Sequence, residues 1–298
     1  MKWILMVLGL VCLARVQAED LIGYLPSYRV NEQALRAAGG CTDVVYFGSE
    51  MQADGSIQLP EGARKQLKQL RKVCKSKRVR MHLCIGGWGK DKHFAGVTSS
   101  EEKRSHFLGE LRMLVEEFDF VGVDYDWEYP RTEAEMRGFV ALCEETKKGL
   151  GKRFMVTAAF HPKHDIPKAL LDALDRVHLM TYDMGGKHCA IEHSERAIQK
   201  WKGKGVDGDK ICTGVAFYAR KLDDRNQVKT YAQMREEFGP DVAKKMPQGG
   251  YFGDNVTSCE AKAALVKKEK IRGLIIWEIG QDAAGEDSLM LPLQRALK

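Results

Sequence analysis

The sequence predicts an α/β fold, a (β/α)8 barrel, in a single domain. Eight short apolar runs alternate with segments of helical character along the chain, which is the pattern of a parallel sheet with crossover helices. The 298 residues, less a leader of 18, leave 280, and such a barrel needs about 250. No linker rich in serine, proline or threonine interrupts residues 19–298. We therefore expect one domain over this range, without an appended module.

Residues 1–18 precede the barrel and have the composition of a secretory signal peptide. Lys2 is the charged start, Trp3–Leu13 is the apolar run, and Val16-Gln17-Ala18 is a small-residue cleavage signature. The run is too short to span a bilayer, which disfavours the alternative, a membrane anchor. We expect a protein that starts at Glu19 and is secreted, or is kept in the lysosome or another compartment of the secretory pathway. No later apolar stretch is long enough to cross a membrane.

Eight apolar runs are expected to form the buried strands. In chain order they are Leu21–Leu25, Asp43–Phe47, Val79–Ile85, Phe120–Asp126, Phe154–Phe160, Arg176–Tyr182, Lys210–Phe217 and Gly273–Trp277. The turn after the first strand, Pro26-Ser27-Tyr28, contains no glycine. This disfavours the alternative architecture, a doubly wound open sheet, because that fold normally has a glycine-rich phosphate turn at this point.

Helix starts lie between these runs. Three sequences have the form of a capping box, namely Ser99-x-x-Glu102, Thr132-x-x-Glu135 and Thr257-x-x-Glu260. The helix after Thr132 is expected to end at Gly149 or Gly151, where glycine accepts the left-handed conformation. The longest interval between predicted strands, Phe217–Gly273, has room for a helix and its loop. It does not have room for a large α+β insertion.

Charge and motif content exclude several classes of partner. The net charge of +6 falls by two to +4 without Lys2 and Arg15, and the remaining excess is spread along the chain. The basic stretch Arg64–Arg80 is typical of a solvated helix face, so we expect no nucleic acid partner. The chain has no CxxC pair and no HExxH motif, so we expect neither a metal site nor a cofactor.

Two features concern covalent modification. Seven of the eight cysteines remain once Cys12 leaves with the leader, and they are Cys41, Cys74, Cys84, Cys143, Cys189, Cys212 and Cys259. The secretory route permits disulfide bonds, and the odd number leaves at least one thiol without an intramolecular partner. Asn255-Val-Thr257 is the one N-glycosylation sequon. We expect a glycoprotein whose sequon lies on a loop near the start of the helix before the last strand.

The most informative stretch is Phe120–Pro130, at the fourth predicted strand. Residues two apart share one face of a strand, so Asp124, Asp126 and Glu128 point the same way, about 6.5 Å apart along the strand. The opposite face carries Val123, Tyr125 and Trp127. Like charges this close push pKa values apart, so one acid is expected to stay protonated.

Glu128 stands at the C-terminal end of this strand, where barrel active sites are built. A proton donor at neutral pH needs a raised pKa, and a row of buried acids supplies one. We therefore predict that Glu128 is a general acid. A solvent-exposed acidic turn is disfavoured because apolar residues interleave with the acids. A calcium or magnesium site is disfavoured because three acids on one straight strand cannot easily wrap an ion.

These residues resemble the DxxDxDxE signature of family 18 glycoside hydrolases, the chitinase family, with Val121 in place of the first Asp. Strand parity turns position 121 away from the other acids, so we expect a structural effect there. Further segments resemble the family in the same order along almost the whole mature chain. They are Gly23-Tyr24, Val45-Tyr46-Phe47, Cys84-Ile-Gly-Gly-Trp88, Met180-Thr-Tyr-Asp183, Gly214-Val-Ala-Phe-Tyr-Ala-Arg220 and Gly273-Leu-Ile-Ile-Trp-Glu278.

The resemblance implies a retaining, substrate-assisted mechanism, which is an exception to the usual two-carboxylate scheme. Glu128 would protonate the leaving oxygen, and the acetamido carbonyl of the substrate would attack the anomeric carbon to give an oxazolinium ion. Asp126 would orient the acetamido group, and Asp124 would lie behind Asp126 and share its proton. Tyr182 would hydrogen-bond the acetamido oxygen, and Asp183 would contact the same sugar.

The resemblance also implies a binding cleft. Trp277 would form the floor beneath the sugar being cleaved, because an indole offers a flat apolar surface. Tyr24 and Phe47 would wall the same site, Trp88 would line the cleft, and Met180 would contact substrate. Arg220 is a candidate for a structural ion pair. The implied partner is chitin or an N-acetylglucosamine oligosaccharide, bound without membrane contact by a monomer.

Cys84 departs from the family pattern, because serine usually occupies this position and is implied to hydrogen-bond the inner acid, Asp124. A thiol is a weaker donor, so we expect a changed pH optimum or a lower turnover. The absence of the large insertion implies a shallow groove and endo-type cleavage. Two alternatives stay open: an endo-β-N-acetylglucosaminidase acting on N-glycans, and a non-catalytic chitin-binding lectin on the same fold. Retention of Glu128, Asp126 and Tyr182 disfavours the lectin.

Overall fold

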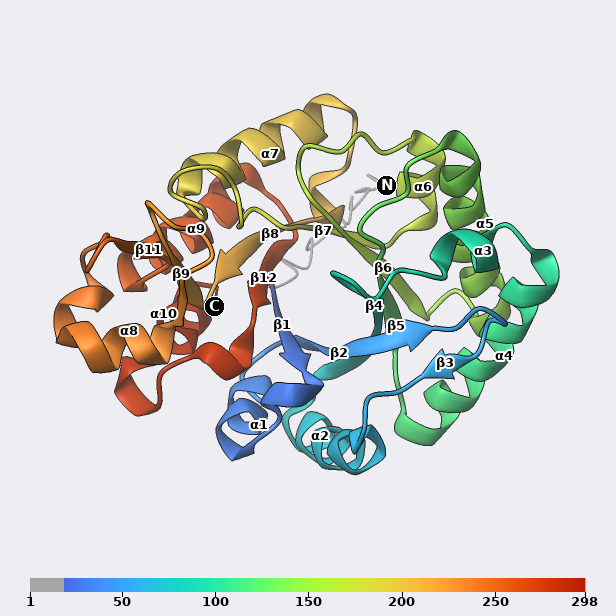
Figure 1. Cartoon of the computed structure of the whole chain (residues 1–298), viewed down its shortest axis with the longest axis horizontal. Coiled ribbons are helices and arrows are strands. Elements are labelled where there is room, and N and C mark those ends of the chain that lie inside the picture. Colours follow the sequence, from blue (N-terminus) through green and yellow to red (C-terminus); the bar gives the residue numbers. More distant parts are fainter. Residues whose placement is uncertain (1–18, 298) are drawn as a thin grey trace, which may run out of the picture.

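The computed structural model describes residues 19–297, and a closed barrel of eight parallel strands lies at its centre (Figure 1). The strands are β1 (Asp20–Pro26), β2 (Asp43–Met51), β4 (Arg80–Gly86), β5 (Gly122–Asp126), β6 (Met155–Phe160), β7 (Arg176–Leu179), β8 (Ile211–Ala216) and β12 (Gly273–Trp277). They follow one another round the barrel in chain order, and β12 pairs with β1 to close it. The predicted (β/α)8 barrel is confirmed.

Helices surround the strands on the outside of the barrel (Figure 1). They are α1 (Glu32–Ala38), α2 (Ala63–Lys77), α3 (Phe94–Thr98), α4 (Glu101–Phe118), α5 (Glu133–Leu150), α6 (Lys168–Ala173), α7 (Ile191–Gly203), α8 (Tyr231–Phe238), α9 (Val256–Glu269) and α10 (Met290–Ala296). Within residues 19–297, no helix is both long and apolar enough to cross a membrane.

Helix caps agree with the sequence in part. The capping box at Thr132 is present, with Glu135 as its partner. Helix α5 ends at Leu150 with the predicted Gly151 as its C-cap, but the ψ of 160° at Gly151 lies outside the expected left-handed helical region. The other two boxes are wrong by one or two residues: Ser100 caps α4 and Asn255 caps α9. In both places several polar residues that can accept a backbone hydrogen bond stand side by side, and sequence alone does not decide which of them does so.

The segment between β8 and α9 holds a small antiparallel sheet that the sequence did not predict. Its strands are β9 (Tyr218–Lys221), β10 (Val228–Thr230) and β11 (Tyr251–Gly253), and α8 lies between β10 and β11. The expected absence of a large α+β insertion is confirmed, because these strands have only three or four residues each. Elsewhere in the chain, one more short strand, β3 (Ile57–Gln58), pairs antiparallel with the end of β2.

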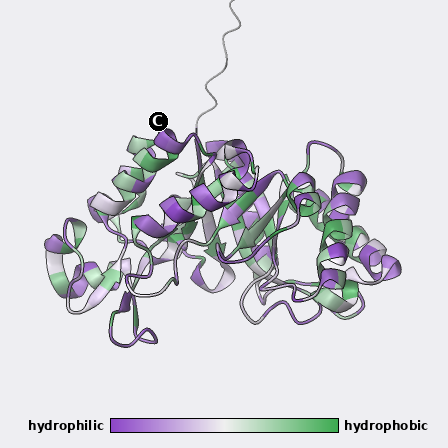
Figure 2. Cartoon of the chain, turned by 90° about the horizontal axis from the view of Figure 1, so that it is seen from above, coloured by the Kyte–Doolittle hydropathy of each residue, from purple (hydrophilic) through white to green (hydrophobic). Residues whose placement is uncertain are grey.

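The side chains of β5 point alternately outward, toward the helices, and inward, into the barrel. Tyr125 packs between the barrel and its helices, with ring centroids 6.1 Å from Phe107 of α4 and 6.0 Å from Phe139 of α5. Alternate residues, Asp124 and Asp126, are buried inside the barrel. The helices carry hydrophilic and hydrophobic residues in turn (Figure 2), as expected of elements with one buried and one exposed face. Alternation predicted that these acids share one face of the strand, and that face is the barrel interior.

An ionic cluster lies at the N-terminal end of the barrel. Arg80 contacts Asp20 at 2.8 Å and Asp43 at 2.7 Å, while Arg176 contacts the same two acids at 2.7 and 3.1 Å. Arg272 adds a further ion pair with Asp20. These residues come from the beginnings of strands β1, β2, β4 and β7 and from the residue before β12. Their ion pairs link neighbouring strands at the N-terminal end of the barrel, opposite the end where the strands finish.

Two expectations about modification are not supported. All seven cysteines within residues 19–297 are free and buried, so none forms a disulfide bond. Asn255 lies at the expected place, before the helix that precedes β12, but it is only 5% exposed. Its side chain caps α9 by accepting a hydrogen bond from the Ser258 backbone at 2.9 Å. A glycan would have to be attached through the Nδ2 of this nearly buried side chain. The predicted signal peptide, residues 1–18, lies outside the described residues.

Candidate active site

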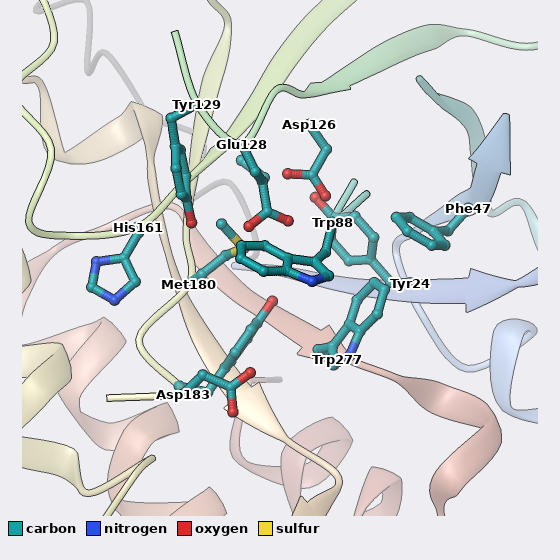
Figure 3. Close-up of a pocket in the computed structure, with 12 residues that line it drawn as sticks. Tyr24, Phe47, Trp88, Asp126, Glu128, Tyr129, His161, Met180, Asp183 and Trp277 are labelled. Carbon is teal, nitrogen blue, oxygen red and sulfur yellow. The ribbon is translucent and has the colours of Figure 1, made fainter. Parts of the chain in front are cut away.

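A cavity of about 170 Å³ opens at the C-terminal ends of the strands (Figure 3). Its lining includes nine of the ten residues that the sequence proposed for the site. The lining residues are Tyr24, Phe47, Trp88, Asp126, Glu128, Tyr129, Ala159, His161, Met180, Tyr182, Asp183 and Trp277. Asp124 does not reach the cavity; it is fully buried behind the lining.

Asp124 is held by three side chains from neighbouring strands. Tyr24 of β1 donates to its Oδ2 at 2.7 Å, Thr157 of β6 donates to its Oδ1 at 2.5 Å, and His178 of β7 lies 3.1 Å from the same Oδ1. Burial would raise the pKa of Asp124, but His178 and the two hydroxyl donors outweigh it and hold the pKa below its ordinary value. Asp124 is therefore an ionised carboxylate at neutral pH.

Asp126 has the opposite environment. Its Oδ1 is buried, and no hydrogen-bond partner for it is found within residues 19–297. Burial, together with the nearby carboxylates of Glu128, Asp124 and Asp91, raises the pKa of Asp126 well above its ordinary value. The pKa values of these neighbouring acids are thus driven in opposite directions, so Asp126 keeps a proton to higher pH than Asp124 does.

Glu128 lies just beyond the end of β5, at the surface of the cavity. Burial raises its pKa, and the nearby Asp91 and Asp183 raise it further, although a hydrogen bond with Tyr129 acts in the opposite direction. A carboxylic acid with a raised pKa keeps its proton closer to neutral pH. This is the requirement for a general acid.

Tyr182 and Asp183 lie in the loop after β7, which ends at Leu179, three residues earlier than predicted. The Tyr182 ring packs directly on Gly214 of β8, where a Cβ atom would lie only 2.7 Å from the ring. Glycine at this position therefore lets the phenol reach the cavity. Asp183 adopts a left-handed backbone conformation with φ of 56°.

Arg220 of β9 forms an ion pair with Asp183, as the sequence suggested. Arg225, in the loop after β9, donates to the Asp183 backbone carbonyl at 2.7 Å. His188 lies 3.7 Å from the Asp183 carboxylate. Burial would raise the pKa of Asp183, but Arg220 outweighs it and holds the pKa low. The small antiparallel sheet is thereby tied to the cavity.

Aromatic side chains wall one side of the cavity. Trp277 at the end of β12 lies edge-to-face with Phe47, with ring centroids 4.8 Å apart, and lies 5.8 Å from Tyr24. These rings come from the last, second and first strands of the barrel. Trp88 is 81% exposed and stands at the mouth. An exposed indole beside a cage of aromatic rings offers flat apolar surfaces of the kind that sugar rings contact.

Five residues at the site were not predicted from sequence. His178 and Thr157 bond to Asp124, while Tyr129, Ala159 and His161 line the cavity. His178 has the same strand parity as the predicted Met180 and Tyr182, so alternation places it on the interior face, but β6, which carries Thr157, contains no predicted site residue. Nothing in the sequence indicates which interior polar residues face Asp124. That depends on the register between strands.

The two departures from the family pattern lie at different distances from the chemistry. Val121 precedes β5 and is 37% exposed, on the side away from the cavity. Cys84 of β4 is directly opposite Asp124 in the β4–β5 register and is fully buried. Burial and the charges of Asp124 and Asp126 raise the pKa of Cys84, so it remains a neutral thiol beside the ionised acid.

The side chains at the cavity can donate a proton to a substrate and can stabilise a positive charge that develops on it. Within residues 19–297, no group of three or more His, Cys, Asp or Glu side chains has the geometry to hold a metal ion. Glu128 can donate a proton to a substrate oxygen in the cavity. Asp126 and the Tyr182 phenol can hold a polar substituent of the same substrate, since a carboxyl group and a hydroxyl provide both donors and acceptors.

Comparison with known proteins gives consistent results. The chain is 24% identical over 291 residues to Endochitinase 1 of Metarhizium robertsii, an alignment that covers 77% of this chain and 67% of the relative. It is 26% identical over 228 residues to the probable endochitinase of Caenorhabditis elegans, covering 61% of this chain and 36% of that protein. The chain thus spans about two thirds of the first relative and about a third of the second.

Solved structures share the fold. A chitinase from Rhizomucor miehei superposes with a TM-score of 0.81 at 20% identity, covering 93% of this chain and 100% of that one. The class V chitinase of Nicotiana tobaccum in complex with NAG4 superposes with a TM-score of 0.80 at 18% identity, covering 94% and 99%. The family model described as glycosyl hydrolases family 18 matches residues 20–282. Because this match covers most of the chain, the protein belongs to glycoside hydrolase family 18.

Proposed function

We propose that the protein is a chitinase that hydrolyses β-1,4-linked N-acetylglucosamine chains with retention of configuration. One observation carries the proposal: the carboxyl groups of Glu128 and Asp126 both have raised pKa values and line the same cavity. Tyr182 and three aromatic side chains on one side line that cavity as well. Curated relatives named endochitinase and solved relatives in complex with NAG4 or (GlcNAc)3 support the choice of substrate.

In the first step, Glu128 donates its proton to the glycosidic oxygen. The acetamido carbonyl oxygen of the substrate bonds to the anomeric carbon as the leaving sugar departs, and positive charge develops on the acetamido group. Asp126 holds the acetamido N–H, and a proton shared between Asp126 and Asp124 lets Asp126 carry the balancing charge. The Tyr182 hydroxyl holds the carbonyl oxygen in line for attack.

In the second step, a water molecule opens the oxazolinium intermediate, and Glu128, now ionised, removes a proton from that water. The anomeric carbon is attacked twice from opposite faces, first by the acetamido oxygen as the leaving sugar departs and then by water as that oxygen departs, so the anomeric configuration is retained. Trp277, Phe47 and Tyr24 surround the reacting ring and exclude bulk water from the intermediate.

We also propose endo-acting cleavage and secretion. Only the small sheet β9–β11 stands where a large insertion could add a wall, and this supports a shallow groove that is open to a continuous polymer. The apolar run near the N-terminus supports entry into the secretory pathway. Protein sequencing of the mature secreted form is expected to begin at Glu19.

The test is a comparison of the wild type with Glu128→Gln on chitin oligomers and on an N-glycan side by side. We expect the wild type to cleave the oligomers and to release β-anomers first, as followed by NMR. Glu128→Gln is expected to lose about 10²- to 10⁴-fold in kcat, because it removes the general acid, while it retains oligomer binding. Glu116→Gln, an exposed change on α4, serves as the control and is expected to match the wild type.

Any of four results would reject the proposal. Cleavage of the N-glycan alone would assign the site to an endo-β-N-acetylglucosaminidase. Tight oligomer binding by the wild type without any product would identify a lectin. Inverted product anomers, or equal activity on sugars that lack the acetamido group, would rule out the substrate-assisted mechanism itself.

A further inference from the structure

The cavity has two sides of different chemistry, with Glu128 between them. Phe47 and Trp277 lie on one side, and Tyr129 and His161 lie on the other (Figure 3). Asp126, which holds the acetamido group in the proposed function, lies on the side of Phe47 (Figure 3). The sugar being cleaved therefore occupies the aromatic side. The sugar that departs from Glu128 lies toward the opposite side.

His161 presents a defined hydrogen-bonding atom on this opposite side. Its Nδ1 accepts a hydrogen bond from the Lys163 backbone N–H at 3.2 Å. Burial, together with nearby Lys163 and His164, lowers the pKa of His161 to about 4, so the ring is neutral near pH 7. A neutral imidazole whose Nδ1 accepts carries its proton on Nε2. His161 therefore has an Nε2–H donor, and no acceptor for it is found within residues 19–297.

The loop that carries His161 is anchored. Lys200 of α7 donates to the carbonyl oxygens of Pro162 and Lys163 at 3.1 and 3.0 Å. The neighbouring His164 ring stacks on Tyr129 with centroids 4.0 Å apart. Because these contacts fix the backbone that follows His161, and strand β6 ends at Phe160 directly before it, the position of the donor is set before substrate arrives.

We propose that His161 is a specificity-determining residue that hydrogen-bonds the leaving sugar. Its ligand is an acceptor oxygen of an N-acetylhexosamine, either a ring hydroxyl or the acetamido carbonyl. The inference rests on the proposed function, since it requires a sugar to leave from Glu128. His161 does not touch the atoms that react, so its effect depends on what the leaving group offers.

The experiment compares two substrates that share the same reacting sugar. One is the β-1,4-linked N-acetylglucosamine tetramer, and the other is the 4-nitrophenyl glycoside of the dimer, whose aryl leaving group has no hydroxyl or acetamido acceptor. His161→Asn keeps a side-chain acceptor for the Lys163 N–H, as in an Asx turn, but its amide is too short to replace Nε2. We expect kcat/KM on the tetramer to fall about fivefold or more, mainly through KM, as for one lost neutral hydrogen bond.

On the aryl glycoside, His161→Asn is expected to stay within about twofold of the wild type. His161→Gln, whose longer amide can again donate, is expected to restore much of the tetramer activity. His106→Ala, an exposed change on α4, is the control and should alter neither substrate. Thermal melting curves of both His161 variants establish that they are folded.

Equal losses on the two substrates would overturn the inference, because His161 would then act on Glu128 and not on the leaving sugar. Unchanged tetramer kinetics would overturn it as well. Both results leave the proposed function standing, since they presuppose wild-type turnover. Absence of wild-type turnover on either substrate would reject the proposed function, and the inference with it.

Discussion

At the scale of single residues, the site depends on how neighbouring carboxylates divide their protons. Asp124 and Asp126 differ by two positions in one strand, yet the pKa of the first is lowered and that of the second is raised. The difference comes from their partners: Asp124 has three, whereas Asp126 has a buried oxygen with none among the described residues. Local donors, and not burial alone, decide which acid is ionised.

Replacement of Cys84 with serine tests the setting of Asp124. A hydroxyl is a better donor than a thiol, so serine would further stabilise ionised Asp124 and lower its pKa. We expect the acidic limb of the pH profile of kcat/KM to extend to lower pH, with equal or higher activity at the optimum. The measurement is a pH–rate profile on a fluorogenic chito-oligosaccharide.

The control is Cys74→Ser, at a buried cysteine of α2 remote from the cavity. It should leave the shape of the pH profile unchanged. If Cys84→Ser gave the same profile as the wild type, the thiol would have no part in the charge state of Asp124, which Tyr24, Thr157 and His178 would then set by themselves.

At the scale of elements, a buried ion pair stabilises strand β8 on its outer side. One partner lies on α9 and the other lies just before that helix. Lys262 is fully buried and donates to Asp254 at 2.7 Å and to the Gly214 carbonyl at 3.0 Å. Asp254 in turn accepts from the Ala216 backbone at 2.8 Å. Because Tyr182 packs on Gly214, this pair also supports one wall of the cavity.

Lys262→Met is expected to destabilise the protein by about 3–5 kcal/mol, because it leaves the Asp254 carboxylate buried without its counter-ion. The double variant Lys262→Met/Asp254→Asn should recover part of this loss, since the remaining side chain is neutral and can still accept the Ala216 N–H. Urea unfolding followed by circular dichroism measures both. A double variant less stable than the single one would show that the two residues do not act as a pair.

Most elements could be predicted from sequence because their apolar runs are long and buried on both faces. The eight strands were recovered to within a few residues, and β12 coincides with the predicted Gly273–Trp277. The small sheet β9–β11 was not predicted from the sequence. Its strands are short, and the segments that contain Lys221 and Val228 show no clear apolar pattern. Its pairing depends on contacts between distant segments, which propensity does not encode.

The candidate site divides in the same way. The acids of β5 could be placed because a period of two is fixed by the backbone, and the aromatic walls because they end predicted strands. His161 and Tyr129 could not be placed, since they lie in loops whose course depends on tertiary anchors such as Lys200. His178 needed the register of β7 against its neighbours, which becomes defined only when the barrel closes.

At the scale of the whole molecule, the two ends of the barrel carry different chemistry. One end is closed by the ion pairs of Asp20 and Asp43, and the other holds the cavity. Glu278 directly follows Trp277, and its buried carboxylate lies 3.1 Å from Arg29 of the 3-10 helix η1 (Ser27–Arg29). This contact joins the ends of the first and last strands beside the cavity.

Glu278 makes stability depend on pH. Burial raises its pKa from 4.5 to about 7, even though Arg29 and the Gly280 N–H act in the opposite direction. A carboxyl group whose pKa is higher in the folded state stabilises the fold while it is protonated, and this contribution is lost as the pH rises through about 7. We expect Glu278→Gln, which cannot ionise, to be more stable than the wild type at pH 9 by about 3 kcal/mol.

The two proteins are expected to differ much less at pH 5, where the wild-type carboxyl group is mostly protonated. Denaturant unfolding at both pH values measures the difference, and Glu116→Gln controls for the loss of one exposed charge. Parallel stability curves for the wild type and Glu278→Gln between pH 5 and 9 would show that ionisation of Glu278 is not the cause.

The pairing of β1 with β12 has a consequence for how the chain acquires its structure. Asp20 is paired with Gly273, so the ring cannot close until the residues through β12 have left the ribosome. Before then, the growing sheet has two open edges that can pair with other chains, and such distant pairing is slow to form. Tyr24 and Trp277 meet only at closure, so chains that end before β12 have no complete aromatic wall at the cavity.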